Sequence, residues 1–169
     1  MSFSLPRGLR DFVNFKDQRV YYNTDRGTVG GEQMILFDGF YACLLLGILH
    51  TGLGKPETVD ETDTFPAGYP NTFKSFREYI AALLVQAELR RTSTEDYGQN
   101  EYERAISKLL QVDAPTGLSE DGIKLANLYA AGGFAFLATS MRPKPANAVN
   151  FLLRFHDLCT QEGILDERA

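Results

Sequence analysis

The hydrophobic pattern of the chain is strongest between residues 128 and 138, where eleven consecutive residues carry no charge. The surrounding pattern predicts one helix over residues 118–141. A helix that is apolar on every side is normally enclosed by other elements, because a surface helix needs only one apolar stripe. Gly132 and Gly133 each reduce helix propensity by about 1 kcal/mol relative to alanine, so we expect another helix to approach them closely. The pattern therefore predicts that this helix is the centre of the fold.

Four further helices are indicated by apolar residues that recur at three- and four-residue spacing. We expect them over residues 32–51, over residues 71–91, from Asn100 to the residues before Pro115, and over residues 146–161. Asn100 is expected to cap the third of these, because Glu103 follows at capping-box spacing. In the last helix, the apolar residues expected to be buried are Val149, Leu152, Leu153, Phe155 and Leu158.

Two segments lack a strong helical pattern. Residues 1–33 contain a short apolar face that includes Leu9 and Phe12, followed by a turn-rich stretch over residues 20–29 that predicts a small hairpin. Residues 52–71 are rich in proline, glycine and acidic side chains, which is typical of a long loop that is either functional or disordered. We therefore expect an N-terminal appendage at 1–33 and a long acidic loop at 52–71.

The fold class that follows is all-α: a compact bundle of five or six helices around the buried helix at 118–141, with a small N-terminal hairpin or irregular segment. A chain of 169 residues fits one domain over residues 1–169, because a domain of this size buries about 70% of its unfolded surface.

Composition narrows the classes of function. The net charge of −5 and the pI of about 5.1 predict an acidic protein with no overall attraction to nucleic acid or anionic membrane. Asp38 and His50 interrupt one apolar stretch and polar residues interrupt the other, so we expect no membrane partner. Cys43 and Cys159 form no disulfide framework, and we expect a cytoplasmic protein with free thiols.

No sequence motif for catalysis, phosphate binding or metal binding is complete. Residues 47–55 fail the spacing of a phosphate loop, because Leu49 stands where its first glycine belongs. Cys43 and His50 lie about 10.5 Å apart along a straight helix, too far to share one zinc ion. We therefore expect no cofactor and no metal, and the catalytic residues stay unknown. An enzyme would need a non-local site that includes Asp38, His50 or His156.

The leading functional hypothesis is protein–protein association, as a subunit or adaptor of a larger assembly, with another protein or a second copy as partner. It rests on aromatic and apolar residues in segments expected to lie outside the core, since exposed Tyr and Phe favour interfaces. A nucleic-acid-binding accessory protein is an alternative, because arginines interleave with aromatics near the N-terminus. The expected partner-binding residues are Arg7, Arg10, Phe12, Arg19, Tyr21, Tyr22, Phe65 and Tyr69.

Overall fold

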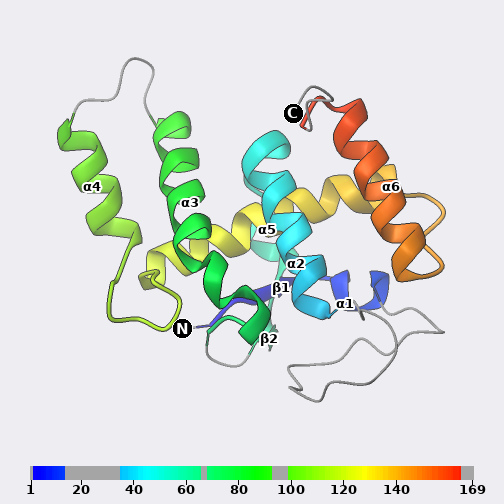
Figure 1. Ribbon diagram of the computed structural model, residues 1–169, viewed down its shortest axis with the longest axis horizontal. Helices are drawn as coiled ribbons and strands as arrows, with labels where there is room; N and C mark the ends of the chain where they lie inside the picture. The colour runs from blue at the N-terminus through cyan, green and yellow to red at the C-terminus, as the bar shows by residue number, and fades with distance from the viewer. Residues whose placement is uncertain (1, 14–34, 66–67, 93–98, 165–169) are drawn as a thin grey trace.

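The computed structural model describes residues 2–13, 35–65, 68–92 and 99–164, and these are mostly helical (Figure 1). One small antiparallel sheet of two strands accompanies the helices. The described part of the chain therefore agrees with the expected all-α class. Its elements, in chain order, are β1 (Ser4–Pro6), α1 (Leu9–Phe12), α2 (Leu36–Leu46), a π-helical turn (Gly47–Thr51), a 3-10 turn (Pro56–Thr58), β2 (Val59–Thr64), a second 3-10 helix (Asn71–Phe76), α3 (Arg77–Thr92), α4 (Gln99–Leu109), α5 (Glu120–Ser140) and α6 (Ala148–Gln161).

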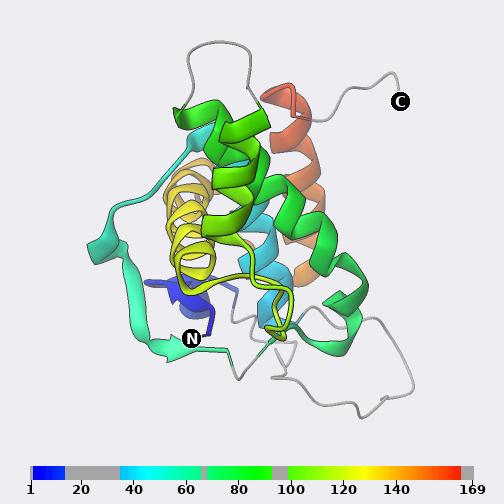
Figure 2. The same ribbon diagram turned by 90° about the vertical axis from the view of Figure 1, so that its left-hand side faces the viewer.

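Helix α5 is the predicted central helix, and it contacts α2, α3, α4 and both strands. Figure 2 views it nearly along its axis, with β2 on one side and α2 on the other. The Ser119 hydroxyl accepts a hydrogen bond from the Gly122 N–H at 3.1 Å and so caps the helix as expected. Most of the residues between Ile123 and Leu137 are buried, but the predicted enclosure is incomplete, because Phe134, Phe136 and Ala138 are half-buried and Ala135 is exposed.

The close approach expected at the paired glycines is also confirmed. A Cβ atom added to Gly133 would lie 1.9 Å from the Cys43 carbonyl oxygen of α2, and one added to Gly47 would lie 1.9 Å from the Tyr129 carbonyl oxygen of α5. A Cβ atom added to Gly132 would lie 2.2 Å from the Gly52 carbonyl oxygen. No side chain fits in these gaps, so α2 and the loop after it rest directly on the backbone of α5.

The two-stranded sheet is not the hairpin expected at residues 20–29, which lie outside the described residues. It instead pairs β1 with β2, from the segment expected to be an irregular loop. The expectation for residues 52–71 is therefore wrong over β2, because antiparallel pairing with β1 supplies backbone hydrogen bonds that no local pattern shows. Residues 2–13 are likewise part of the core, not an appendage, since Leu5, Leu9 and Val13 are buried.

A cluster of buried aromatic rings joins the N-terminal segment and the loop after β2 to α2. Phe37 makes edge contacts with Phe65 and Phe73, with ring centroids 5.0 and 4.7 Å apart. Phe3 and Tyr69 lie 5.3 Å apart in the same cluster. These segments are distant in sequence, so the cluster holds the N-terminus and the loop against α2 through side chains that no helical period links.

Two polar residues lie near the starts of helices. Asp38 is close to the start of α2, and its carboxylate accepts a hydrogen bond from the Ile35 N–H at 2.6 Å. The free N–H groups at a helix start are natural partners for a carboxylate. Asn100 lies inside α4, which begins at Gln99, so it does not occupy the cap position expected from the sequence.

The largest correction concerns α6. The helix forms close to the expected range, but Val149, Leu152 and Leu153 are exposed. The side of α6 that meets the core is formed by Ala148, Phe151, Leu158 and Cys159. Of the five residues expected to be buried, Leu158 is buried and Phe155 is half-buried. The apolar stripe is broader than the face that α6 presents to the core.

Candidate protein-binding groove

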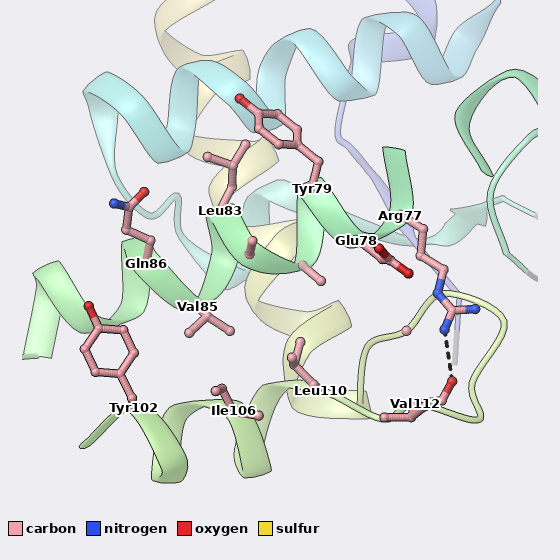
Figure 3. Close-up of a pocket in the computed structure, with 13 residues that line it drawn as sticks. Arg77, Glu78, Tyr79, Leu83, Val85, Gln86, Tyr102, Ile106, Leu110 and Val112 are labelled. Atoms are coloured by element: carbon pink, nitrogen blue, oxygen red, sulfur yellow. Dashed lines mark hydrogen bonds between the residues drawn. The ribbon is translucent and has the colours of Figure 1, made fainter. Parts of the chain in front are cut away.

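The candidate functional site is an open groove between the neighbouring helices α3 and α4 (Figure 3). The chain leaves α3 and returns along α4, so the two helices lie side by side. The groove has a volume of about 670 Å³ and a predominantly apolar surface. Its lining consists of Arg77, Glu78, Tyr79, Ala81, Ala82, Leu83, Val85, Gln86, Tyr102, Ile106, Leu110, Val112 and Gly117.

The walls of the groove carry large apolar side chains that the core leaves uncovered. Tyr79 on α3 is 56% exposed, and Tyr102 and Ile106 on α4 are 44% and 45% exposed. On the same two helices Leu84 and Leu109 are buried in the core. Each helix therefore has an apolar surface wider than its core contact. Tyr102 and Ile106 lie on the α4 side of the groove, whereas Tyr79 projects from the side of α3 away from α4 (Figure 3).

One end of the groove is closed by Arg77 and the loop after α4. The Arg77 guanidinium donates a hydrogen bond to the Val112 carbonyl oxygen at 3.0 Å. Gly117 lies against the same side chain, because a Cβ built there would be 2.9 Å from Arg77 Nε. Gly117 also has a φ of +72°, a conformation that favours glycine. These contacts fix the loop that carries the exposed Val112 beside the start of α3.

The lining is suited to binding by apolar contact. It contains no histidine, cysteine, serine or aspartate, and its one carboxylate is that of Glu78. Its charged members, Arg77 and Glu78, lie together at the start of α3. Apolar walls with tyrosines and a charged end are typical of surfaces that bind other proteins.

The residues expected to bind a partner lie elsewhere, and three of them are not exposed. Phe12, Phe65 and Tyr69 are all buried in the core, so the expectation that they lie outside it is wrong. The physical reason is the β1–β2 pairing and the aromatic cluster, which carry these side chains inward. None of the three lines the groove. Arg19, Tyr21 and Tyr22 lie outside the described residues.

Arg7 and Arg10 are exposed beside β2, which carries acidic residues. The Arg10 guanidinium makes a two-point ion pair with Asp63, with distances of 2.7 and 2.5 Å. Asp60 accepts hydrogen bonds from the Thr62 hydroxyl and N–H, and these lower the pKa of its carboxyl. The carboxylates of β2 thus oppose the positive charge that a phosphate backbone would need at this place.

The three residues of the enzyme hypothesis are not gathered around the groove. Asp38 lies near the start of α2, and burial raises the pKa of its carboxyl, which the hydrogen bond from Ile35 partly offsets. His50 lies in the turn beyond the other end of α2, with its Nε2 3.3 Å from a Glu162 carboxylate oxygen. The His156 side chain is 70% exposed on α6. Asp38 and His50 are twelve residues apart, which corresponds to about 18 Å along a helix.

The thiols and possible metal ligands also lie apart. Cys43 and Cys159 are free and buried, and burial raises the pKa of both thiols. Within the ranges that the structure describes, no three His, Cys, Asp or Glu side chains are grouped closely enough to hold a metal ion. Among the same residues, no helix combines the length and the apolar character needed to cross a bilayer.

The residues that define the groove were not recognised as a site from the sequence. Tyr102 and Ile106 belong to an apolar stripe on α4 that Leu110 continues just after the helix. The stripe is the signal that the sequence offers, but its spacing does not tell which of its members the core covers.

Comparisons with models of known protein families, with curated proteins and with solved structures give no match to this chain. The fold and the groove define its class: a mostly helical protein with an open apolar groove on its surface.

Proposed function

We propose that this protein acts by protein–protein association and that the α3–α4 groove binds an amphipathic helix of a partner protein. The single observation that carries the proposal is the exposure of Tyr102 and Ile106 in the lining of one groove whose surface is predominantly apolar. Apolar surface gathered in this way is uncommon on a protein that works alone and is typical of interaction sites.

The shape of the groove favours a helix as its occupant. Two neighbouring helices leave a furrow between them, and the apolar ridge of a third helix fits such a furrow through residues spaced at i, i+3 or i+4, and i+7. Tyrosines supply large contact areas at a small cost in conformational entropy, and they are enriched among residues that dominate binding energy. Arg77 and Glu78 at one end would select the direction of the bound helix through its charged residues.

The nucleic-acid and enzyme alternatives have less support. The acidic side chains of β2 lie beside Arg7 and Arg10, and salt-dependent binding to phosphates requires an uncompensated positive surface. An enzyme would require a pocket that joins Asp38, His50 or His156 to a substrate, and none of the three lines the groove. We accordingly prefer association, with the chain acting as one cytoplasmic domain whose helices bundle around α5.

The proposal can be tested with a displayed library of helical peptides whose surface positions are randomised. We expect the selected peptides to carry apolar residues at helical spacing and to lose at least about tenfold in affinity, about 1.4 kcal/mol, for the Ile106→Glu variant. Leu153→Glu is the matched control, because Leu153 is also exposed and belongs to α6, at the opposite end of the molecule from α3 and α4. Thermal unfolding should confirm that both variants remain folded.

Selection of peptides that bind the wild type and the Ile106→Glu variant equally would refute the groove as the binding site. Recovery of no binding peptide at micromolar concentration would count against a helix as its occupant. A set of peptides that depends on Leu153 instead would transfer the proposed function to α6.

A further inference from the structure

A second cavity lies where β1 and β2 meet α5. Both strands contact α5 (Figure 2). The cavity has a volume of about 530 Å³ and a predominantly apolar surface, which are typical of sites that bind small molecules. It is called the strand–helix cavity below. No described residue lines both this cavity and the groove, so the strand–helix cavity is a separate candidate site.

The buried side chain of Asn127 on α5 is part of the cavity lining, and it is only 6% exposed. Its Oδ1 accepts a hydrogen bond from the Ser4 N–H of β1 at 3.1 Å, so the oxygen of the amide faces β1. Its Nδ2 donates to no described residue, although buried polar groups normally have a hydrogen-bond partner. Unlike the Tyr69 hydroxyl, this nitrogen is not sealed off by the protein. Its N–H groups are therefore available to a molecule in the cavity.

Lys124 supplies a positive charge beside this amide. It is exposed on α5 and lines the cavity, and its spacing of three residues places it on the same side of the helix as Asn127. Within the described part of the chain, Lys124 forms no ion pair. A carboxylate accepts hydrogen bonds from both an ammonium and an amide N–H, and the charges strengthen such bonds. Lys124 and Asn127 together therefore favour a carboxylate.

An irregularity in β2 brings Glu61 and Thr64 to the same cavity. In a regular strand, residues three positions apart point to opposite faces. Here Ser4 pairs with Thr64 but the next residue, Leu5, pairs with Asp60, so the residues of β2 between Asp60 and Thr64 lie opposite no residue of β1. Bulges of this kind re-aim side chains and are frequent beside active sites. The bulge thus adds a carboxylate and a hydroxyl to the cavity.

The two charged side chains of the cavity lining have opposite signs and come from different elements. Glu61 is exposed on β2 and, like Lys124 on α5, forms no ion pair with a described residue. Its carboxylate favours an ammonium group. Val59 and Leu128 contribute apolar surface to the same lining. A ligand that satisfies these features has an ammonium, a carboxylate and an apolar group.

We propose that the strand–helix cavity binds a free amino acid with an apolar side chain. Its carboxylate binds Lys124 and the Asn127 Nδ2, its ammonium binds Glu61, and its side chain lies against Val59 and Leu128. One positive and one negative side chain match a zwitterion, which has no net charge, better than they match an ion of either sign. A nucleotide phosphate would need more positive charge than one lysine supplies.

Four small probes separate these contributions when the isotope-labelled full chain is titrated and followed by nuclear magnetic resonance. L-Leucine has the ammonium, the carboxylate and an apolar side chain. N-acetyl-L-leucine lacks the ammonium and represents the C-terminal residue of a peptide, L-leucinamide lacks the carboxylate and represents the N-terminal residue, and glycine lacks the apolar side chain. We expect L-leucine to bind with a dissociation constant of about 1 mM or less and to shift the signals of the Asn127 side-chain NH₂. Each other probe should bind at least about tenfold more weakly.

Substitutions at the two charged residues test the role of each. Lys124→Met should weaken the binding of L-leucine at least about tenfold but should not weaken that of L-leucinamide, which has no carboxylate to lose its partner. Glu61→Gln should weaken the binding of L-leucine but not that of N-acetyl-L-leucine, which has no ammonium. Lys74→Met is the matched control, because Lys74 is exposed and lies outside the cavity lining.

Asn127→Asp tests the buried amide. An aspartate keeps an oxygen that can accept the hydrogen bond from the Ser4 N–H, but it replaces the N–H donors by a second oxygen. We expect the binding of L-leucine to be lost, because that oxygen would face the carboxylate of the ligand. Thermal unfolding should show that the variant remains folded. If it does not, the substitutions at the exposed Lys124 and Glu61 still test the proposal.

Three outcomes would overturn the proposal. They are no binding of L-leucine at about 10 mM, equal or tighter binding of N-acetyl-L-leucine or L-leucinamide, and wild-type affinity for L-leucine in Lys124→Met and Glu61→Gln. Equal binding of one of the two blocked probes would identify a peptide terminus as the ligand. Ile106→Glu in the groove should bind L-leucine like the wild type, so either this proposal or peptide binding at the groove can fail while the other stands.

Discussion

The contact between α2 and α5 and the outer surface of α6 have similar sequence patterns and opposite positions in the structure. Both are rich in leucine and other apolar residues at helical spacing, and both are predicted to be buried. In the first, Gly47 and Gly133 bring two helix backbones into direct contact. In the second, Val149, Leu152 and Leu153 are exposed. The difference lies in the glycines, because they alone indicate that another backbone comes close.

This comparison shows what an apolar stripe does and does not predict. A stripe predicts that a helix has a surface that avoids water, but not whether this chain or another molecule covers it. Paired glycines inside a helix lower its intrinsic stability, so their presence points to a packing partner. An apolar stripe that is wider than the contact with the core and contains no glycine, as on α4, is instead the surface from which we infer binding.

The largest effect is expected from one truncation made on both sides of the comparison. Leu137→Ala in α5 should lower the free energy of unfolding by about 2–5 kcal/mol, because Leu137 is fully buried and its loss leaves a cavity. Leu153→Ala in α6 should change it by less than about 0.5 kcal/mol. Urea unfolding of the two variants and the wild type measures both changes in the free energy of unfolding. Similar losses in the two variants would show that α6 is covered within the monomer.

The next largest effect is expected at Gly133, where helix propensity and the contact with α2 predict opposite changes in the free energy of unfolding. Helix propensity alone predicts that Gly133→Ala stabilises the protein by about 1 kcal/mol. The structure predicts destabilisation by about 1–3 kcal/mol, because the new Cβ would overlap the Cys43 carbonyl. Ala135→Gly, on the exposed side of the same helix, is the matched control and should lose about 1 kcal/mol. A more stable Gly133→Ala variant would contradict the close approach of α2.

A smaller effect on stability is expected from removing a tyrosine hydroxyl, and it should differ between Tyr69 in the core and Tyr79 in the lining of the groove. The Tyr69 hydroxyl is buried and has no hydrogen-bond partner among the described residues. Tyr69→Phe should therefore stabilise the protein by about 1 kcal/mol, because it removes an unsatisfied buried group. Tyr79→Phe at the exposed wall of the groove should leave stability within about 0.5 kcal/mol. Thermal unfolding of the two variants is the measurement, and a destabilised Tyr69→Phe would indicate an unrecognised partner for the hydroxyl.

The smallest effect concerns the carboxylate near the start of α2. Burial raises the pKa of Asp38 above its usual value of 3.8. The folded state therefore binds this proton more tightly than the unfolded state. The resulting stability is fully present below pH 3.8 and is lost as the pH rises through the folded pKa. Asp38→Asn should remove this pH dependence and be no less stable than the wild type at pH 7, if the amide oxygen keeps the bond from Ile35.

Unfolding at pH 7 and at pH 3.5 checks this expectation, since the stability of the variant relative to the wild type should be higher at pH 7. The opposite order would mean that the hydrogen bond to Ile35 outweighs burial. It would also mean that ionised Asp38 stabilises the start of α2.

Much of the helical architecture could be predicted because its signals are local. Ser119 caps α5 through a bond to Gly122 three residues away, and Gly163 adopts a φ of +68° just after α6 ends. The sheet could not be predicted, because β1 and β2 are more than fifty residues apart and neither is stable alone. The groove could not be located either, because α3 and α4 expose whichever part of their stripes the core does not need.

The sequence by itself determined the positions of the long helices and the close contact at Gly132 and Gly133, because spacing, capping and glycine content act over a few residues. Only the tertiary structure decided which apolar surfaces are covered. It placed Phe65 and Tyr69 inside and Ile106 and Leu153 outside. Burial depends on the neighbours that the whole chain brings to each side chain, and residues with the same local pattern can therefore end on opposite sides of the protein surface.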